Sequence, residues 1–305
     1  MPTCIKCGKE PITFIRYNGS HLCEEHFLEF VVKRVRKEMR RQVNLDGKHR
    51  LAVALSGGKD SSVTLSILAE TLERRRDFTV LAITVDEGIA CYRPGTMQKA
   101  EELCRDLGVE HHVIRVADET SRTMDEIASK VGVRSACTYC GVLRRRCMNK
   151  LARDLDADVL ATGLNLDDTA QSILMNFTRG DVEKLARLGP HTRIQAGLIP
   201  RIQPLRLIPE KESLMYAMLR ELPFSSAECP YAEGALRNEY REIVDELEDR
   251  HPGTRHAIVN SYDAMRPYLL AAYPPANLEV CGCGEPTSGD VCKSCELLEE
   301  VKRIG

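Results

Sequence analysis

The chain of 305 residues is long enough to bury a full hydrophobic core, and its 43% hydrophobic and 29% charged residues are typical of a globular protein. A formal net charge of -2 argues against a protein that coats nucleic acid over its whole surface, although a local basic face is compatible with it. No apolar stretch is long enough to span a bilayer, and the N-terminus lacks the features of a signal peptide, so we expect a cytoplasmic protein without a membrane partner.

The N-terminal segment carries paired cysteines, and a second set of paired cysteines lies near the C-terminus. In a reducing compartment such spacings indicate metal ligands rather than disulfides. Two pairs of ligands with no position left for water are typical of structural zinc sites, and a nucleic-acid-binding finger is the functional alternative. We predict two Zn²⁺ ions, one held by Cys4, Cys7, Cys23 and His26 and the other by Cys281, Cys283, Cys292 and Cys295.

A basic amphipathic stretch follows, and the chain then alternates between strands and helices. The first stretch has apolar residues at helical spacing over 27–41, and its basic face from Lys33 to Arg41 is either an RNA-backbone contact or a solvated surface. Strands are predicted at 51–55, 79–85, 111–116 and 159–162, and helices at 62–72, 95–107, 120–131 and 143–155. After a proline-containing connection at 189–209 the pattern is helical to about residue 270.

This alternation predicts the fold class and the domain organisation. It is typical of an α/β fold with a doubly wound parallel sheet, in which ligands bind beyond the carboxyl ends of the strands. We divide the chain into an N-terminal zinc module at 1–30, a catalytic domain at 31–272 and a C-terminal zinc module at 273–305.

The loop after the first of these strands is rich in glycine, serine and charge. Its sequence is Ser56-Gly57-Gly58-Lys59-Asp60-Ser61-Ser62. Glycines let the backbone approach a phosphate closely, and the amides at the start of the following helix bind anionic oxygens. Lys59 adds positive charge, and the spacing is not that of the Walker motif. We therefore predict a phosphate-binding loop, with an ordinary tight turn as the alternative.

Three further cysteines lie in the middle of the chain. Cys137-x2-Cys140 falls between two predicted helices, and Cys229 precedes a proline. A zinc knuckle would need a fourth ligand, which no neighbouring residue supplies convincingly. Three thiolates without a fourth favour an iron–sulfur cluster with one open iron, and redox cysteines that carry a persulfide are the alternative.

Three runs of residues resemble the tRNA 2-thiouridine synthetases, and the resemblance covers almost the whole chain. The runs are Cys137-Thr138-Tyr139-Cys140-Gly141-Val142-Leu143-Arg144-Arg145, Ala161-Thr162-Gly163-Leu164-Asn165-Leu166-Asp167-Asp168 and Glu228-Cys229-Pro230-Tyr231. The phosphate loop is similar to the Ser-Gly-Gly-x-Asp-Ser loop of the PP-loop ATP pyrophosphatases, a Rossmann-like family of adenylating enzymes. The relatives include the TtuA-type and wobble-uridine thiolation enzymes and, more distantly, the TtcA cytidine thiolases.

The resemblance implies a set of cofactors, a partner and site residues. ATP and a [4Fe-4S] cluster are the implied cofactors, tRNA is the implied partner, and Mg²⁺ would accompany ATP. Cys137, Cys140 and Cys229 would bind the cluster, and Lys59 and Asp60 would take part in catalysis. The residues assigned to ATP are Ala54, Ser56, Gly57, Gly58, Lys59, Asp60, Ser61, Ser62, Ile83, Asp86, Arg144, Gly163 and Asp168. Asp60 and Asp168 are the better candidates for the metal, whereas Asp86 either contacts metal or ribose or caps its strand.

Two positions depart from the family pattern. The family usually has Thr-Gly-His-Asn, and this chain has Leu164 in place of the histidine. Arg144 stands where the TtuA branch has a lysine, which keeps the charge but changes the geometry of the hydrogen-bond donors. Together with its neighbours at 145 and 146, Arg144 is also a candidate for contact with the RNA backbone.

The predicted function is that of a tRNA uridine 2-sulfurtransferase, in which ATP adenylates the uridine O2 and a cluster-bound sulfur replaces it. One alternative is a PP-loop ligase with redox or persulfide cysteines. Another is a non-catalytic zinc-ribbon protein that binds RNA. The sequence leaves open the target uridine, at the wobble position or in the T-loop. It also leaves open the sulfur donor, free sulfide or a ubiquitin-like thiocarboxylate carrier, and the choice between monomer and homodimer.

Overall fold

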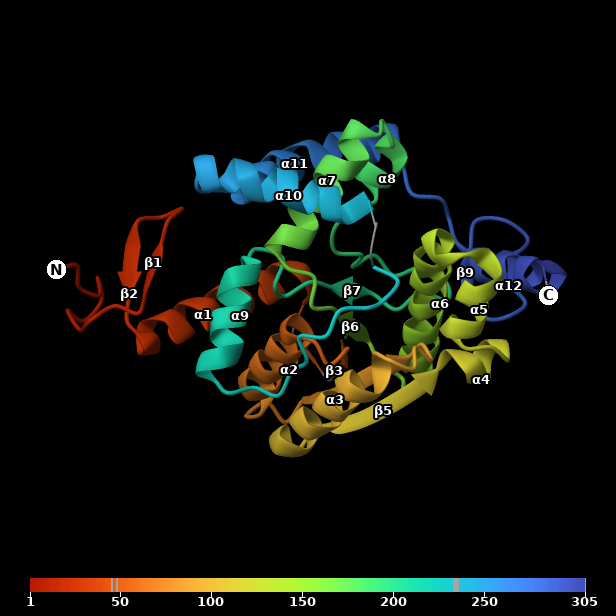
Figure 1. Ribbon diagram of the computed structural model, residues 1–305, viewed down its shortest axis with the longest axis horizontal. Helices are drawn as coiled ribbons and strands as arrows, with labels where there is room; N and C mark the ends of the chain where they lie inside the picture. The colour runs from red at the N-terminus through yellow and green to blue at the C-terminus, as the bar shows by residue number, and fades with distance from the viewer. Residues whose placement is uncertain (45, 48, 233–235, 305) are drawn as a thin grey trace.

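A five-stranded parallel sheet forms the centre of the computed structural model, which describes residues 1–304 except 45, 48 and 233–235 (Figure 1). Its strands are β3 (His49–Ala54), β4 (Phe78–Asp86), β5 (Glu110–Arg115), β6 (Val159–Ala161) and β7 (Arg201–Ile202), in the order β5-β4-β3-β6-β7. All neighbouring pairs are parallel. The order reverses between β3 and β6, and in such sheets a reversal marks the place where ligands bind. The predicted doubly wound α/β fold is confirmed.

Side chains of the central strands alternate between two apolar layers. Leu51 and Val53 pack toward α2 (Lys59–Leu72) and α3 (Arg93–Leu107), whereas Ala52 packs toward α6 (Val133–Asp154) on the opposite face. This alternation buries both faces of the sheet, as a parallel sheet requires. Helix α1 (Glu24–Gln42) and helix α9 (Glu210–Leu219) pack beside α2.

A separate layer of helices lies above the sheet in Figure 1. It consists of α7 (Leu166–Thr178), α8 (Val182–Ala186), α10 (Leu236–Arg250) and α11 (Thr254–Ala272). Its core includes the fully buried side chains of Val244, Val259 and Tyr262. The Tyr262 hydroxyl donates hydrogen bonds to the carbonyls of Leu185 and Leu188, which fastens α11 to the end of α8.

The two termini form small modules at opposite ends of the molecule (Figure 1). The N-terminal module contains the antiparallel hairpin of β1 (Thr13–Ile15) and β2 (Ser20–Leu22) and leads directly into α1. The C-terminal module contains β8 (Glu279–Val280), β9 (Pro286–Thr287) and α12 (Lys293–Ile304), and α12 packs on α5 (Met124–Val131) and α6. Buried Glu285 anchors this module, because its carboxylate lies 2.9 Å from Arg153 Nη2 on α6.

Three sequence-based expectations were wrong. The expected helix at 120–131 is divided into α4 (Val116–Thr120) and α5, because Ser121 adopts a left-handed conformation with φ 60° between them. Helix α6 begins at residue 133 rather than 143, so Cys137 and Cys140 lie inside a helix and not between two helices. The connection at 189–209 contains strand β7, and the chain from 220 to 232 is not helical. Strand β7 has two residues, too few to give a periodic pattern.

Among the described residues, no helix is both long enough and apolar enough to cross a membrane.

Candidate active site

The predicted phosphate loop joins the end of β3 to the start of α2, at the point where the strand order reverses. Gly57 has φ 82°, and a β-carbon there would lie 1.9 Å from the carbonyl oxygen of Thr96, so only glycine fits. Gly58 is the N-cap of α2 and has no side chain to cap the helix. The first amides of α2 therefore remain free for an anionic ligand.

Serine hydroxyls hold the shape of the loop. Ser61 Oγ lies 3.0 Å from Ser56 Oγ and donates to the Gly58 carbonyl at 2.8 Å. Ser56 Oγ in turn accepts from the Gly58 amide at 3.3 Å. Ser62, also predicted to bind ATP, is fully buried and donates to the Pro223 carbonyl at 3.1 Å. Its hydroxyl therefore fixes the loop to the chain that follows α9.

Lys59 lies between two carboxylates. Its Nζ is 3.0 Å from Asp60 Oδ2 and 2.7 Å from Glu210 Oε1. Burial alone would lower the pKa of Lys59, but these two carboxylates raise it, so the ammonium stays charged. Burial, with Asp60 and Glu210 nearby, raises the pKa of Asp168, and Arg237 opposes that shift from 3.1 Å.

One oxygen in this acidic group lacks a partner. Asp60 Oδ1 is buried and has no hydrogen-bond partner among the described residues. A buried carboxylate oxygen of this kind is costly unless a cation or donor satisfies it. Oxygen ligands from carboxylates suit Mg²⁺, so Asp60 and Asp168 fit the metal that accompanies a nucleotide.

Gly163 brings strand β6 against the first turn of α2. A β-carbon at this position would lie 2.8 Å from the Ser61 amide nitrogen, closer than real contacts allow. Asn165 then caps α7 in a capping box with Asp168, whose carboxylate accepts from the Asn165 amide at 3.3 Å. The run from Gly163 to Asp168 thus begins against the phosphate loop.

Arg93 and Glu87 are site residues that the sequence analysis missed. Arg93 is 3% exposed, and its Nη1 donates to the Ser56 carbonyl at 3.0 Å while its Nη2 donates to the Val85 carbonyl at 2.6 Å. Its Nε lies 2.8 Å from Glu87 Oε2, which supplies the counter-charge. Arg93 therefore ties the phosphate loop to the end of β4. The only sequence signal was the place of Glu87, directly after a predicted strand and its terminal aspartate.

The three central cysteines border the same site. The segment after α9 runs along the phosphate loop, where the Ser225 amide donates to the Gly57 carbonyl at 2.8 Å, and it then carries Cys229. Cys137 Sγ donates to the Tyr231 carbonyl at 3.1 Å. Cys140 and Cys229 pack against one apolar cluster, and burial raises the pKa of the Cys140 thiol to about 11, with smaller contributions from its neighbours. The structure thus brings the three thiols into one region.

The remaining residues assigned to ATP differ in their surroundings. Ile83 is buried in the core, and Ala54 packs beside that core. Asp86 Oδ1 accepts from the Gly88 amide at 2.9 Å, which is the capping geometry that we left open. The Arg144 side chain is 52% exposed and lies 3.9 Å from Glu87, so it is available to a ligand. Leu164 is 40% exposed and lines a cavity of about 80 Å³ beside Asp168 and Arg237.

Both terminal sets of predicted zinc ligands are assembled. In each set the four ligand atoms lie within 4.8 Å of one another. Backbone amides hold the pKa of the Cys281 thiol at about 6, so it ionises readily at neutral pH. The three central cysteines do not form such a compact set among the described residues.

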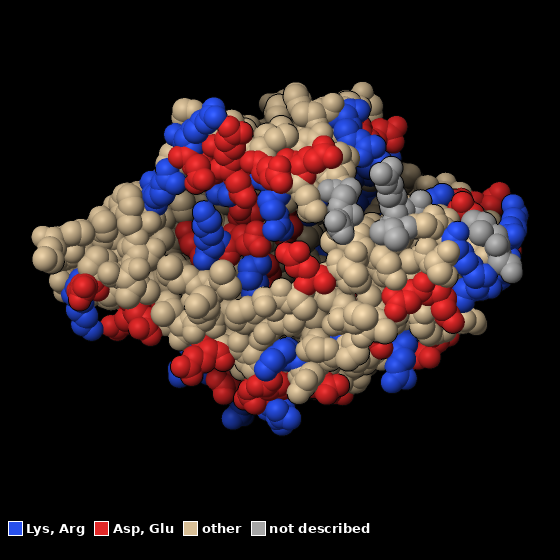
Figure 2. Space-filling view, viewed as in Figure 1, with Lys and Arg blue, Asp and Glu red and all other residues tan. Residues whose placement is uncertain are grey.

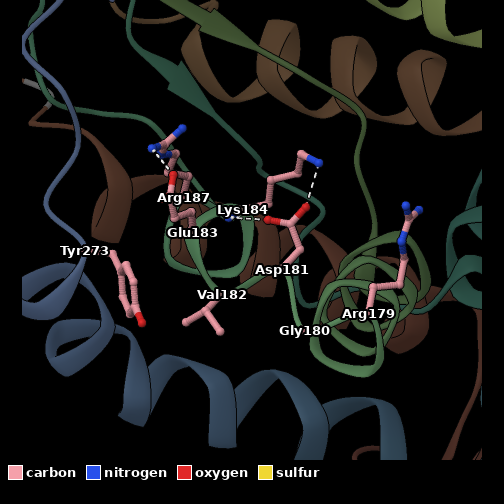
Figure 3. Close-up of a pocket in the computed structure, with 8 residues that line it drawn as sticks. All are labelled: Arg179, Gly180, Asp181, Val182, Glu183, Lys184, Arg187 and Tyr273. Atoms are coloured by element: carbon pink, nitrogen blue, oxygen red, sulfur yellow. Dashed lines mark hydrogen bonds and ion pairs between the residues drawn. The ribbon is translucent and has the colours of Figure 1, made fainter.

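The surface has a hollow between the helical layer and the sheet, and a separate cavity away from the predicted site. The face in Figure 2 is hollowed between the upper helices and the sheet, and acidic and basic side chains meet in this hollow. A cavity of about 540 Å³ lies elsewhere, around α8 (Figure 3). Four of its five charged side chains pair with each other, Lys184 with Asp181 and Arg187 with Glu183, and none of its lining residues belongs to the predicted site.

Comparisons with known proteins agree with this geometry. A family model of the PP-loop domain matches residues 30–247, and a model of the N-terminal LIM domain of the 2-thiouridine synthetase TtuA matches residues 3–28. The chain is 39% identical to the tRNA 2-thiolation protein NcsA of Haloferax volcanii, with 99% of each chain covered. It is 32% identical to the tRNA-5-methyluridine(54) 2-sulfurtransferase of Pyrococcus horikoshii, with 99% of this chain and 95% of the other covered.

A solved structure is similar along most of its length. It is the U34-tRNA thiolase NcsA from Methanococcus maripaludis with its [4Fe-4S] cluster, with a TM-score of 0.81, 36% identity, and coverage of 88% of this chain and 89% of the other. These likenesses extend from the N-terminal ligand set through the phosphate loop to the last helices. The chain therefore belongs to the PP-loop family of tRNA 2-thiolation enzymes.

Proposed function

We propose that this protein is a tRNA uridine 2-sulfurtransferase. ATP would adenylate the O2 of a uridine, and sulfur would then replace that oxygen, giving 2-thiouridine, AMP and pyrophosphate. The observation that carries the proposal is the contact between the Ser225 amide and the Gly57 carbonyl, since it puts the cysteine-bearing segment beside the phosphate loop. An adenylating loop and a sulfur site are the two halves of this reaction.

The chain's own residues would bind and activate ATP. The free amides at the start of α2 and the ammonium of Lys59 would hold the β- and γ-phosphates, because both oppose the negative charge that grows on the leaving pyrophosphate. Asp60 and Asp168 would hold Mg²⁺, which the unpartnered Oδ1 of Asp60 supports. Arg93 would keep the loop carbonyl of Ser56 turned inward.

The three cysteines would supply the sulfur half. Cys137, Cys140 and Cys229 fit a [4Fe-4S] cluster, and such a cluster with three protein ligands leaves one iron open to an exogenous sulfur. Arg144 lies one helical turn after Cys140 and is half-exposed, so its guanidinium would offset charge on the activated uridine and the departing AMP.

The other parts of the proposal concern folding and partners. The two four-ligand sets would hold structural Zn²⁺ in modules at 1–30 and 273–305, on either side of a catalytic domain at 31–272. The identity to the solved U34-tRNA thiolase, 36%, is higher than the 32% identity to the tRNA-5-methyluridine(54) 2-sulfurtransferase, which favours the wobble uridine at position 34 as the target. The sulfur donor, the homodimer and a cytoplasmic location stay predictions.

Anaerobic purification tests the proposal. We expect a brown protein with iron and sulfide that releases AMP in the presence of tRNA and forms 2-thiouridine, detected by mass spectrometry of the tRNA nucleosides and mapped to its position. Cys137→Ala should lose the colour and the thiolation, whereas Cys91→Ala, at another exposed cysteine, should keep both. A colourless protein with full activity would rule out the cluster, and AMP release that tRNA does not stimulate would favour the ligase alternative.

A further inference from the structure

Four positively charged or titratable side chains gather at the outer edge of the sheet, beside the edge strand β7. They are Arg145 on α6, His191 in the connection before β7, Arg201 on β7 and Arg266 on α11. We call this set the edge cluster. None of its members belongs to the predicted ATP, cluster or zinc sites.

The backbone fixes three of these residues next to one another. His191 and Arg201 form a directly opposed antiparallel pair, with amide-to-carbonyl hydrogen bonds of 3.0 and 2.9 Å in both directions, so their side chains project from the same face. Arg266 Nη2 donates to the carbonyl of Pro190, the neighbour of His191, at 3.3 Å. The Arg266 guanidinium carbon also lies 3.7 Å from the place that a Gly189 β-carbon would occupy.

Little negative charge balances the edge cluster. The ion pairs within 4.0 Å among the described residues do not include Arg145, Arg201 or Arg266, and the nearby carboxylate of Glu285 already pairs with Arg153. The Nε atoms of Arg201 and Arg266 are buried without a hydrogen-bond partner in the described part of the chain. Burial is the main cause that lowers the pKa of Arg201 to about 10, and the positive charge of Arg145 is the second.

Such a gathering of like charges costs folding free energy unless an anion compensates for it. The anion is not the ATP phosphate, because the phosphate loop follows β3 and strand β6 separates β3 from β7. The cluster nevertheless borders the active site. Gly189 precedes Pro190, whose carbonyl accepts from Arg266, and it lines the cavity of about 80 Å³ together with Leu164 and Asp168. An RNA whose target base enters the site would pass its backbone over this edge.

We propose that the edge cluster binds phosphodiester groups of the tRNA substrate next to the nucleotide that enters the active site. This inference rests on the proposed function, because it assigns the partner of the same site. Guanidinium groups suit phosphate, since they present planar pairs of donors, and three chain segments that converge on one place supply more than one such group. Free inorganic phosphate has the same chemistry and is the alternative source of the anion.

The test compares Arg266→Gln and Arg201→Gln with wild type in the full-length, cluster-containing protein. Arg105→Gln, at an exposed arginine on α3 outside the edge cluster and the active site, is the matched control. We expect each edge variant to bind tRNA about tenfold more weakly and to reduce the slope of log affinity against log salt by about one, whereas the control keeps both. The affinity for ATP should not change in any variant.

Thermal unfolding separates a binding role from a structural one. Removing one of several uncompensated charges should leave the melting temperature unchanged or raise it, whereas loss of a structural contact would lower it. Wild-type affinity and salt slope in both edge variants would overturn the proposal. The proposal would also be overturned if the two edge variants lost affinity for inorganic phosphate but kept wild-type affinity for tRNA. A wild-type protein that binds tRNA through these arginines but forms no 2-thiouridine would instead overturn only the proposed function.

Discussion

The Ser225 amide donates a 2.8 Å hydrogen bond to the Gly57 carbonyl and thereby joins the segment that carries Cys229 to the phosphate loop. A ligand that orders the loop should order this segment as well. We expect a non-hydrolysable ATP analogue to slow hydrogen–deuterium exchange in peptides that cover 224–231. The hairpin at 13–22, which lies in the N-terminal module, is the internal control. Protection of the loop without any change at 224–231 would show that the two segments are not coupled.

Lys59→Met should abolish most of the ATP-dependent activity. The substitution removes the cation between Asp60 and Glu210 and leaves two carboxylates facing the phosphates. We expect tRNA-stimulated AMP release to fall by about a hundredfold or more, as for loss of a charge that stabilises a transition state. Lys99 on α3 is also ion-paired, and the control variant Lys99→Met should retain wild-type activity. Retention of more than half of the activity in Lys59→Met would argue against a role for Lys59 in phosphate binding.

Gly163→Ala should weaken ATP binding. The added β-carbon would lie 2.8 Å from the Ser61 amide nitrogen, so β6 and the first turn of α2 must separate. Gly95→Ala is the matched control, because nothing lies within 4 Å of its β-carbon and it falls within helix α3. Alanine in a helix is more stable than glycine by about 0.5–1 kcal/mol, so the control should unfold at an equal or higher temperature. Isothermal titration measures the affinity of both variants for ATP, and thermal unfolding measures their stability.

Arg93→Met should damage the phosphate loop and leave the cysteine site intact. It removes the donor to the Ser56 carbonyl and the close counter-charge of buried Glu87, which keeps only Arg144 at 3.9 Å. Breaking a buried pair in this way typically costs up to about 3–5 kcal/mol. The double variant Arg93→Met/Glu87→Gln removes the unpaired charge and should recover part of the stability but not the affinity for ATP. Urea unfolding, nucleotide titration and the visible absorption of the cluster measure the three effects separately. Recovery of ATP affinity together with stability would show that Arg93 does not position the loop.

His256 should make the stability of the protein fall as the pH is lowered. Burial, followed by the charge of Arg34, lowers the pKa of His256 from 6.5 to about 4. Between these values the unfolded chain takes up a proton that the folded chain refuses, so stability is full above pH 6.5 and is lost toward pH 4. The loss is at most about 3 kcal/mol.

Urea unfolding at pH 7 and pH 4.5 tests this expectation. His256→Asn should lose less stability between the two values than wild type does, whereas His251→Asn, at the exposed end of α10, should behave as wild type. Equal pH dependence in all three proteins would contradict a depressed pKa at His256.

The sequence by itself determined the features that depend on residues close to one another in the chain. The phosphate loop from Ser56 to Ser62, the ligand pairs at both ends and the alternation of strands and helices are local patterns, because backbone geometry, chelation and side-chain periodicity act over a few residues. The same patterns carried the resemblance to the thiolation enzymes, which the comparisons confirm.

Only the tertiary structure decided which distant groups meet. Glu210 at the start of α9 pairs with Lys59 at the start of α2, and Arg93 reaches the Ser56 carbonyl from the next strand–helix unit. The two-residue strand β7 has no periodicity of its own and exists because β6 offers it an edge, which in turn gathers the arginines around Arg201. Such contacts depend on how the elements pack, and packing energies come from residues far apart in the chain, so no local pattern encodes them.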